Sequence, residues 1–154
     1  MVTGLAAVAA LAAGVFWMQR GAHLELTGSI VKVRTLAVDD KASLAVIDFR
    51  FANIASYPFV VRDVTVEIAD ASGKVLKGRT IPDTDARSVF DYYPALGPRA
   101  NESLITRASV PPHAQLNRMV MVRFEVPEAT VAGRKALTMR IAEVDGAVSE
   151  LKQP

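Results

Sequence analysis

The fold class is decided by the stretch Ala45-Val-Ile-Asp-Phe-Arg-Phe-Ala52. Its odd-numbered positions are all apolar, namely Ala45, Ile47, Phe49 and Phe51, and the charged residues Asp48 and Arg50 alternate with them. Because successive side chains of a β-strand point to opposite faces, this alternation predicts a strand with one buried face and one face in water.

Working outward from this stretch, the same period of two recurs along the chain. It is clearest at residues 64–68, 120–126 and 137–141, each of which alternates apolar with polar or long side chains. Asp70-Ala-Ser-Gly-Lys74 supplies turn residues before Val75-Leu76, so a hairpin is expected there.

Two further segments are β-like but less regular. Leu24 to Thr35 loses its alternation near Gly28-Ser29, which indicates a bulge. Leu104 to Val110 reads as a strand that ends at Pro111-Pro112, because proline cannot donate to a β-ladder.

Asp83 to Tyr93 is the exception to the β pattern. The segment follows Pro82, carries acidic residues early and stops before Pro94, as a helix of two to three turns would. We expect Phe90 and Tyr93 to cap one open end of the sandwich.

About seven short strands without alternating long helices predict two antiparallel sheets packed face to face. The fold expected is an all-β, immunoglobulin-like or fibronectin-III-like sandwich over residues 24–150, with residues 151–154 as a tail. A length of 154 residues suits one such domain.

The N-terminus has a different composition. Residues 2–18 contain no ionisable side chain, and all 34 charged residues lie at or beyond Arg20. At about 1.5 Å per residue, a helix of this length reaches roughly 26 Å, close to a hydrocarbon core of about 30 Å. The sequence therefore predicts a transmembrane anchor at 1–19 and a short tether at 20–23. The residues expected to form this membrane anchor are Leu5, Val8, Leu11, Val15, Phe16 and Trp17.

Two other interpretations of this segment stay open. Ala10-Leu11-Ala12 could be the cleavage site of a secretory signal, and the run could also be a buried helix of a soluble protein. Orientation is ambiguous as well. Arg20 favours a cytoplasmic domain by the positive-inside rule, whereas a short N-terminal anchor before a lone β-domain favours export, which we expect.

A family resemblance rests on Phe49-Arg-Phe-Ala-Asn53, Tyr57-Pro-Phe-Val-Val61, Val64-Thr-Val-Glu-Ile68 and the Gly73 turn. Together they resemble the water-stress domain of late embryogenesis abundant type 2 proteins. Asn53 keeps the first asparagine of that family's motif, but Ile54 and Ala55 replace the residues that follow it. The resemblance implies a non-catalytic β-sandwich with a protective role in the cell envelope, and it transfers no ligand.

Composition excludes several classes of chemistry. Without cysteine there are no disulfides, thiolate metal sites or cysteine nucleophiles. His23 and His113 lack the spacing of metal ligands. The acidic pairs Asp39-Asp40 and Asp83-Thr-Asp85 lack the glycine and glutamate of a calcium loop, so turn formation and helix capping explain these two pairs. No Gly-x-Ser-x-Gly elbow or phosphate-binding loop occurs, and a net charge of +2 is too small for a nucleic-acid interface. We expect no metal and no cofactor, and the sequence identifies no small-molecule substrate.

Aromatic and ionisable side chains gather after residue 83. The group comprises Phe90, Asp91, Tyr92, Tyr93, Arg99 and His113. One interpretation is a partner-binding surface, because loops at the ends of a sandwich carry binding and tyrosine offers large contact area. In the other, Phe90 and one tyrosine cover the core while Asp91 pairs with Arg99. The second is favoured, since a domain with few aromatic residues usually buries them.

Met119 and Met121 form a smaller anomaly, because they lie opposite the apolar face of Val120 and Val122. They either belong to a partner surface or lie under a neighbouring loop.

Three functions follow from these patterns. The preferred one is a non-catalytic, single-pass interaction or accessory subunit of a larger membrane or envelope complex, with its β-domain outside the cytoplasm. The second is the stress-protective domain that the resemblance implies. The third, a hydrolase using His113, lacks any recognisable constellation of catalytic residues.

Overall fold

The computed structural model describes residues 26–153. The predicted anchor at 1–19, the tether at 20–23 and His23 lie outside the described residues. Within residues 26–153, no helix combines the length and the apolar character needed to cross a membrane.

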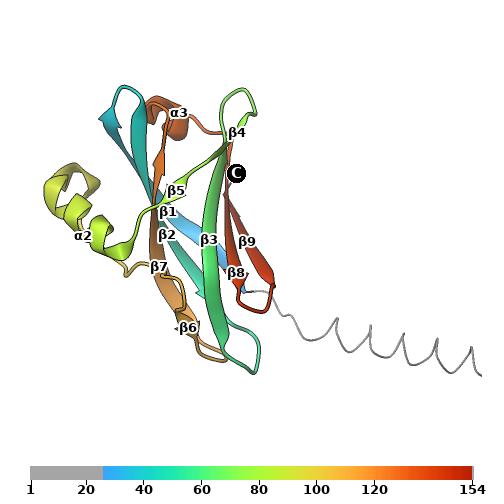
Figure 1. Ribbon diagram of the computed structural model, residues 1–154. Helices are drawn as coiled ribbons and strands as arrows, with labels where there is room; N and C mark the ends of the chain where they lie inside the picture. Colours follow the sequence, from blue (N-terminus) through green and yellow to red (C-terminus); the bar gives the residue numbers. More distant parts are fainter. Residues whose placement is uncertain (1–25, 154) are drawn as a thin grey trace, which may run out of the picture.

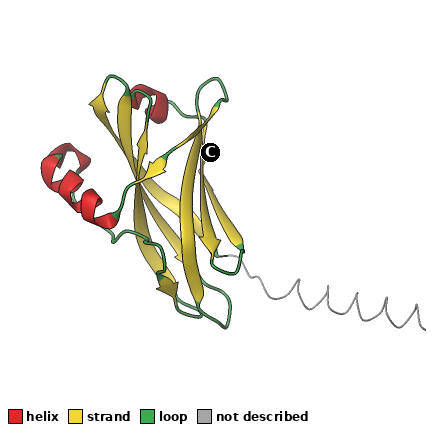
Figure 2. Cartoon of the chain, viewed as in Figure 1, coloured by secondary structure: helices red, strands yellow, loops and turns green. Residues whose placement is uncertain are grey.

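The described chain forms two antiparallel sheets packed face to face, as Figures 1 and 2 show. The first sheet has the order β1 (Thr27–Asp39), β2 (Ala42–Ala52), β7 (Gln115–Phe124) and β5 (Arg79–Thr80). The second has the order β4 (Val75–Lys77), β3 (Phe59–Ala69), β8 (Ala136–Glu143) and β9 (Val148–Gln153), and β6 (Ser109–Val110) pairs with β3. The prediction of an all-β antiparallel sandwich is confirmed.

The core between the sheets is built from the alternating positions that the sequence singles out. Ala45, Ile47, Phe49 and Phe51 are at most 1% exposed and belong to one apolar cluster. Across from them, β3 and β8 contribute their own alternating residues, such as Val66 and Met139. Local periodicity was therefore sufficient to identify the inner face of β2.

The outer face of β2 was expected to lie in water, and this was wrong over Val46 and Asp48. Val46 is fully buried and Asp48 is 5% exposed, whereas Arg50 is exposed as expected. The reason is that helix α2 (Asp83–Tyr92) and the short helix η1 (Pro94–Leu96) cover this part of the sheet.

Helix α2 begins after Pro82 and ends before Pro94, as predicted. Its expected position, closing an open end of the sandwich, was wrong. Ala86 of α2 and Leu96 of η1 pack with Val46, Met119 and Met121 in a second apolar cluster on the outer face of the first sheet. Figure 2 shows the helix beside this sheet, on the side away from the second sheet. The helix lies there because the outward side chains of β2 and β7 are apolar at these positions.

Three boundaries differ from the expectation. The first register shift in β1 lies between Ile30 and Lys32 rather than at Gly28-Ser29. Within Leu104 to Val110, only Ser109–Val110 is a strand. The expected tail at 151–154 is corrected for residues 151–153, which end β9, because Leu151 pairs with Met139 and is 3% exposed.

A third helix, α3 (Glu128–Ala132), connects β7 to β8 and contributes Val131 to the core.

Candidate interaction groove on the outer sheet face

The register of the first sheet sets side chains of distant segments in rows across the strands. Leu36 of β1 lies opposite Leu44 of β2, Leu44 opposite Arg123 of β7, and Arg123 opposite Arg79 of β5. The next row, two residues along, contains Val46, Met121 and Ile81, whose amide donates to the Met121 carbonyl at 2.8 Å. Both rows face outward, opposite the core residues Val120 and Val122.

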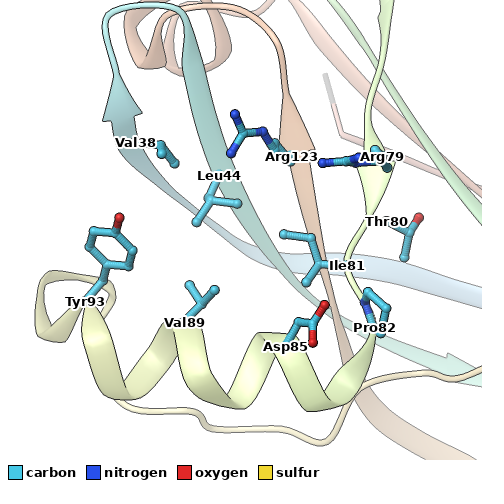
Figure 3. A pocket seen from close by; sticks show the side chains of 10 residues that line it. All are labelled: Val38, Leu44, Arg79, Thr80, Ile81, Pro82, Asp85, Val89, Tyr93 and Arg123. Carbon is cyan, nitrogen blue, oxygen red and sulfur yellow. The ribbon is translucent and has the colours of Figure 1, made fainter.

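Helix α2 covers Val46 and Met121 of the second row, whereas Ile81 is only half-buried and lines a groove beside the first row. The cavity volume is about 580 Å³. Its lining consists of Val38, Leu44, Arg79, Thr80, Ile81, Pro82, Asp85, Val89, Tyr93 and Arg123. In Figure 3, Val89 and Tyr93 rise from α2 toward the sheet, Leu44 and Ile81 lie between helix and strands, and the two arginines lie beyond them. The groove therefore has an apolar floor and a basic rim.

The two rim arginines are in different electrostatic situations. The Arg123 Nε donates to Glu125 Oε1 at 2.9 Å, and this hydrogen bond together with the Glu125 charge raises the pKa of Arg123. Arg79 is exposed, and its side chain makes no hydrogen bond or ion pair with any residue in 26–153. Asp85, on the helical wall, is the carboxylate among the lining residues.

A buried polar network holds the helical wall in place. Arg34 Nη2 donates to Asp48 Oδ2 at 2.9 Å, and Arg34 Nη1 donates to the carbonyls of Leu96 and Pro98 at 2.7 and 2.9 Å. Asn101 Nδ2 donates to the other Asp48 oxygen at 2.8 Å. The Arg34 guanidinium also lies 5.5 Å from the ring centroid of Phe90 in α2. One strand arginine thus ties the sheet to α2, η1 and the loop that follows.

Asp83 fixes the start of α2. It accepts hydrogen bonds from Arg87 at 2.9 Å and from Arg99 at 2.5 Å. The nearby Ser103 hydroxyl, with Arg87 and Arg99, lowers the pKa of Asp83. The expected capping role for Asp83 and Asp85 is corrected, since Pro82 occupies the N-cap and no side chain within 26–153 makes a capping hydrogen bond. At the other acidic pair the expected turn is present, with the Lys41 amide donating to Asp39 Oδ1 at 2.7 Å.

The predicted cluster after residue 83 is brought together only in part. Tyr93 lines the groove, and its ring contacts the exposed ring of Tyr92 edge-on at a centroid distance of 4.8 Å. Asp91 is exposed, and the expected pair between Asp91 and Arg99 is replaced by Arg99 with Asp83. Phe90 and Tyr93 are half-buried against the second apolar cluster.

His113 does not join this cluster. It is exposed in the loop before β7, with a positive φ of 57°. The β7 residue nearest to it, Gln115, is six residues from Met121, roughly 20 Å along the strand.

Met119 and Met121 are 0% and 1% exposed and lie beneath α2 and η1. Of the two alternatives, burial under a neighbouring segment holds, and their placement on a partner surface is corrected. The period of two was right about the face they occupy, but it carried no information on what covers that face.

Sequence reasoning missed the groove residues Val38, Leu44, Arg79, Ile81 and Val89. The sequence did contain one signal for the groove, the alternation of side chains along β7, which places Arg123 on the same face as Met119 and Met121. Pairing of Arg79 with Arg123 depends on strand register, which a single sequence does not reveal.

For the part of the chain that the structure describes, no group of three histidine, aspartate or glutamate side chains could hold a metal ion. Among residues 26–153, those that line the groove include no histidine, serine, cysteine or lysine.

No protein-family model and no curated protein matches the sequence. Among solved structures, an uncharacterised β-sandwich protein from Clostridium difficile 630 is similar, with 12% identity and a TM-score of 0.44 over 84% of this chain and 86% of that one. The archaellum periplasmic stator protein FlaG from Sulfolobus acidocaldarius has 9% identity and a TM-score of 0.36, over 83% of this chain and 99% of that one. The FlaF and FlaG stator complex of the same organism gives 11% identity and 0.35, over 84% of this chain and 89% of the matched chain. These likenesses assign neither a family nor a function to the chain.

Proposed function

We propose that the chain is a membrane-anchored, non-catalytic interaction domain, an accessory or structural subunit of a larger membrane or envelope complex, and that the groove beside α2 receives a segment of its partner protein. The observation that carries this proposal is the groove itself, with its volume of about 580 Å³, its apolar floor and its basic rim. Concave sites with an apolar lining and a few placed polar groups are the usual places for binding.

The lining favours binding over turnover. Its ionisable side chains are Arg79, Arg123, Asp85 and Tyr93, and the described part of the chain places no histidine or lysine there to take or give a proton near neutral pH. The aliphatic hydroxyl in this set belongs to Thr80, and it donates a hydrogen bond to the Val64 carbonyl at 3.0 Å. Such a set can position a ligand through charge and apolar contact without activating it.

The anchoring part of the proposal rests on the apolar segment before Arg20. The domain is packed from its first described residue, because Leu26 is buried and its amide donates to Ser149 Oγ at 2.7 Å. Six residues lie between positions 19 and 26, so the connecting chain, seven Cα–Cα steps long, reaches at most about 25 Å. A helix spanning at 1–19 would hold the sandwich close to the bilayer, on the non-cytoplasmic side.

Photocrosslinking in native membranes tests the partner. Benzoylphenylalanine in place of Tyr93 changes one aromatic side chain for another on the groove wall, and the same label at Lys152 reports on exposed β9 of the second sheet. We expect a discrete, stoichiometric adduct with one membrane protein from position 93 and none from position 152. Equal labelling from both positions, or no adduct at all, would contradict the proposal.

The anchor is tested by deleting residues 1–18. The remaining chain should be folded, soluble and absent from the membrane fraction, with circular dichroism as the check on folding. Continued membrane association of this variant would argue against the leading segment as the sole anchor.

A further inference from the structure

The pairing of Arg79 with Arg123 is unfavourable for the isolated domain. The two residues are directly opposite each other in the β5–β7 register, where Cβ atoms lie roughly 4.5 to 5.5 Å apart. Like charges in this position destabilise a sheet. Glu125 offsets the charge of Arg123, but no carboxylate within residues 26–153 bonds to Arg79. At the rim of the groove, the Arg79 guanidinium therefore has no partner among the residues that the structure describes.

Taking the proposed function as its basis, we infer that Arg79 and Arg123 bind a carboxylate of the partner, and that the groove selects a protein segment in which an acidic and an apolar residue are two positions apart. Arginine presents its donors in a planar fork that matches a carboxylate. A carboxylate between the two guanidinium groups removes the like-charge repulsion that the free domain carries.

The two-residue spacing between the acidic and the apolar residue of the partner follows from the two rows of side chains on the first sheet. Arg123 and Arg79 belong to the first row, whereas Ile81 belongs to the second, two residues along the strands. Rows two residues apart are separated by about 6.6 Å, which is also the distance between side chains on one face of an extended peptide. An acidic side chain over the arginines thus places the side chain two positions away over Ile81, facing Val89 on the helical wall.

Asp85 fixes which end of the occupant is acidic. It lines the groove from the first turn of α2, next to Pro82 and Ile81 in Figure 3. A carboxylate placed over Ile81 would meet this like charge, while one placed over Arg79 and Arg123 would not. The groove accordingly favours the acidic residue at the arginine row and the apolar residue at the Ile81 row.

Fluorescence anisotropy with the purified full chain in nonionic detergent tests this selection. The probe is a fluorescein-labelled peptide of two Thr-Glu-Thr-Leu repeats, which sets glutamate and leucine on one face of an extended chain. Controls are two Thr-Gln-Thr-Leu repeats, which lack the charge, two Glu-Leu-Thr-Thr repeats, which lack the spacing, and empty micelles. We expect the first peptide to bind about tenfold more tightly than either control peptide, the size of one lost charge-assisted contact.

Variants locate the binding. Arg79→Gln and Arg123→Gln should each weaken binding of the glutamate peptide about tenfold, and the corresponding lysine variants should weaken it less, because lysine keeps the charge but not the fork. The matched control, Arg62→Gln with Arg107→Gln, removes two exposed arginines from β3 and the loop before β6 and should leave binding unchanged. Thermal unfolding of Arg79→Gln without peptide should not occur at a lower temperature than in the parent chain, which excludes misfolding as the cause of weak binding.

Each other outcome has a defined meaning. Equal binding of the glutamate and glutamine peptides overturns the inference, and so does undiminished binding by the double variant Arg79→Gln/Arg123→Gln. Stronger displacement of the peptide by phosphatidylglycerol than by phosphatidylcholine, each added as mixed micelles with the same detergent, also overturns it, because that result indicates a lipid occupant. Self-association that is lost in the arginine variants also overturns it, because the occupant is then a second copy. A groove adduct from position 93 with no charge preference would refute the inference alone, whereas charge-selective peptide binding without such an adduct would refute the proposed function alone.

Discussion

Substituting Asp48 tests whether the buried network under α2 holds the outer layer of the fold. The Asp48 and Arg34 side chains are 8% and 13% exposed and form an ion pair at 2.9 Å. In Asp48→Ala, the Arg34 guanidinium keeps its two carbonyl acceptors at Leu96 and Pro98 but loses its counter-charge, and Asn101 loses an acceptor. The substitution leaves a charge uncompensated in a site that little water reaches.

The expected magnitude is large compared with the stability of a small domain. Removing one partner of a buried ion pair costs about 3 to 5 kcal/mol, out of a total unfolding free energy of about 5 to 15 kcal/mol. Asp48→Asn should cost less, about 1.5 to 3 kcal/mol, because an amide oxygen can still accept a hydrogen bond. Replacing both partners, Arg34→Met with Asp48→Leu, should recover most of the loss, since no charge is then left buried.

Equilibrium unfolding in urea, followed by far-UV circular dichroism, measures these differences. Glu150→Gln is the matched control, because Glu150 pairs with Arg140 and Lys152 at a side-chain exposure of 33%. A pair this exposed contributes little to stability, because solvent screens the two charges. The reasoning would be refuted by an Asp48→Ala variant no less stable than Glu150→Gln, or by a double replacement less stable than the single one.

Three further predictions use the same assay. Phe49→Ala removes a fully buried ring that stacks on Phe51 at a centroid distance of 5.5 Å, and should cost about 3 to 5 kcal/mol; a loss below 1 kcal/mol would contradict the packing described. Gly28→Ala places a Cβ 2.3 Å from the Arg50 carbonyl oxygen and should cost at least about 1 to 3 kcal/mol, unlike a substitution on an open strand surface, which should be near neutral. The pKa of Asp83 in the folded state is lowered from 3.8, so the contribution of its carboxylate to folding stability is present above about pH 4 and disappears as the pH falls through the lower folded value. Asp83→Asn should therefore be less stable than the parent chain at pH 7, and this difference in stability should shrink below pH 4.

The inner layer of this fold could be predicted because it is encoded locally. The alternation at Ala45, Ile47, Phe49 and Phe51 requires no knowledge of the partner strand to show that these residues share a face. Helix α2 was also predictable, since Pro82 and Pro94 delimit it. Both signals extend over fewer than about a dozen residues, which is the range in which sequence patterns are informative.

The outer layer could not be predicted because it depends on contacts between distant segments. Strand alternation predicts that Asp48 faces water, but its partners are Arg34 on β1 and Asn101 beyond η1. Arg99 lies close to Asp91 in sequence, but the direction of the chain after η1 brings it to Asp83 at the start of the helix. Charge identity predicts that a partner exists, whereas tertiary geometry decides which one.

The same distinction explains the groove. Arg79 and Arg123 become neighbours only through the β5–β7 register, and that register is fixed where Gly78, Thr80 and Ile81 bond to the carbonyls of Val66, Val64 and Met121. A shift of one residue would turn Arg79 toward the core and remove the groove's basic rim.

The buried network and the groove are mechanically connected, since both use the segment from α2 to Asn101. Val89 and Tyr93 form the groove wall, while the next residues along the chain, at Leu96 and Pro98, are fixed by Arg34. A wall held in this way is formed before the partner arrives, so its ordering does not have to be offset by binding energy. Loosening it in Asp48→Asn should therefore weaken binding of the glutamate peptide even where far-UV circular dichroism still reports a folded sandwich. Unchanged binding in that variant would show that the groove wall is positioned by the apolar contacts of Ala86 and Leu96 alone, without the Arg34 network.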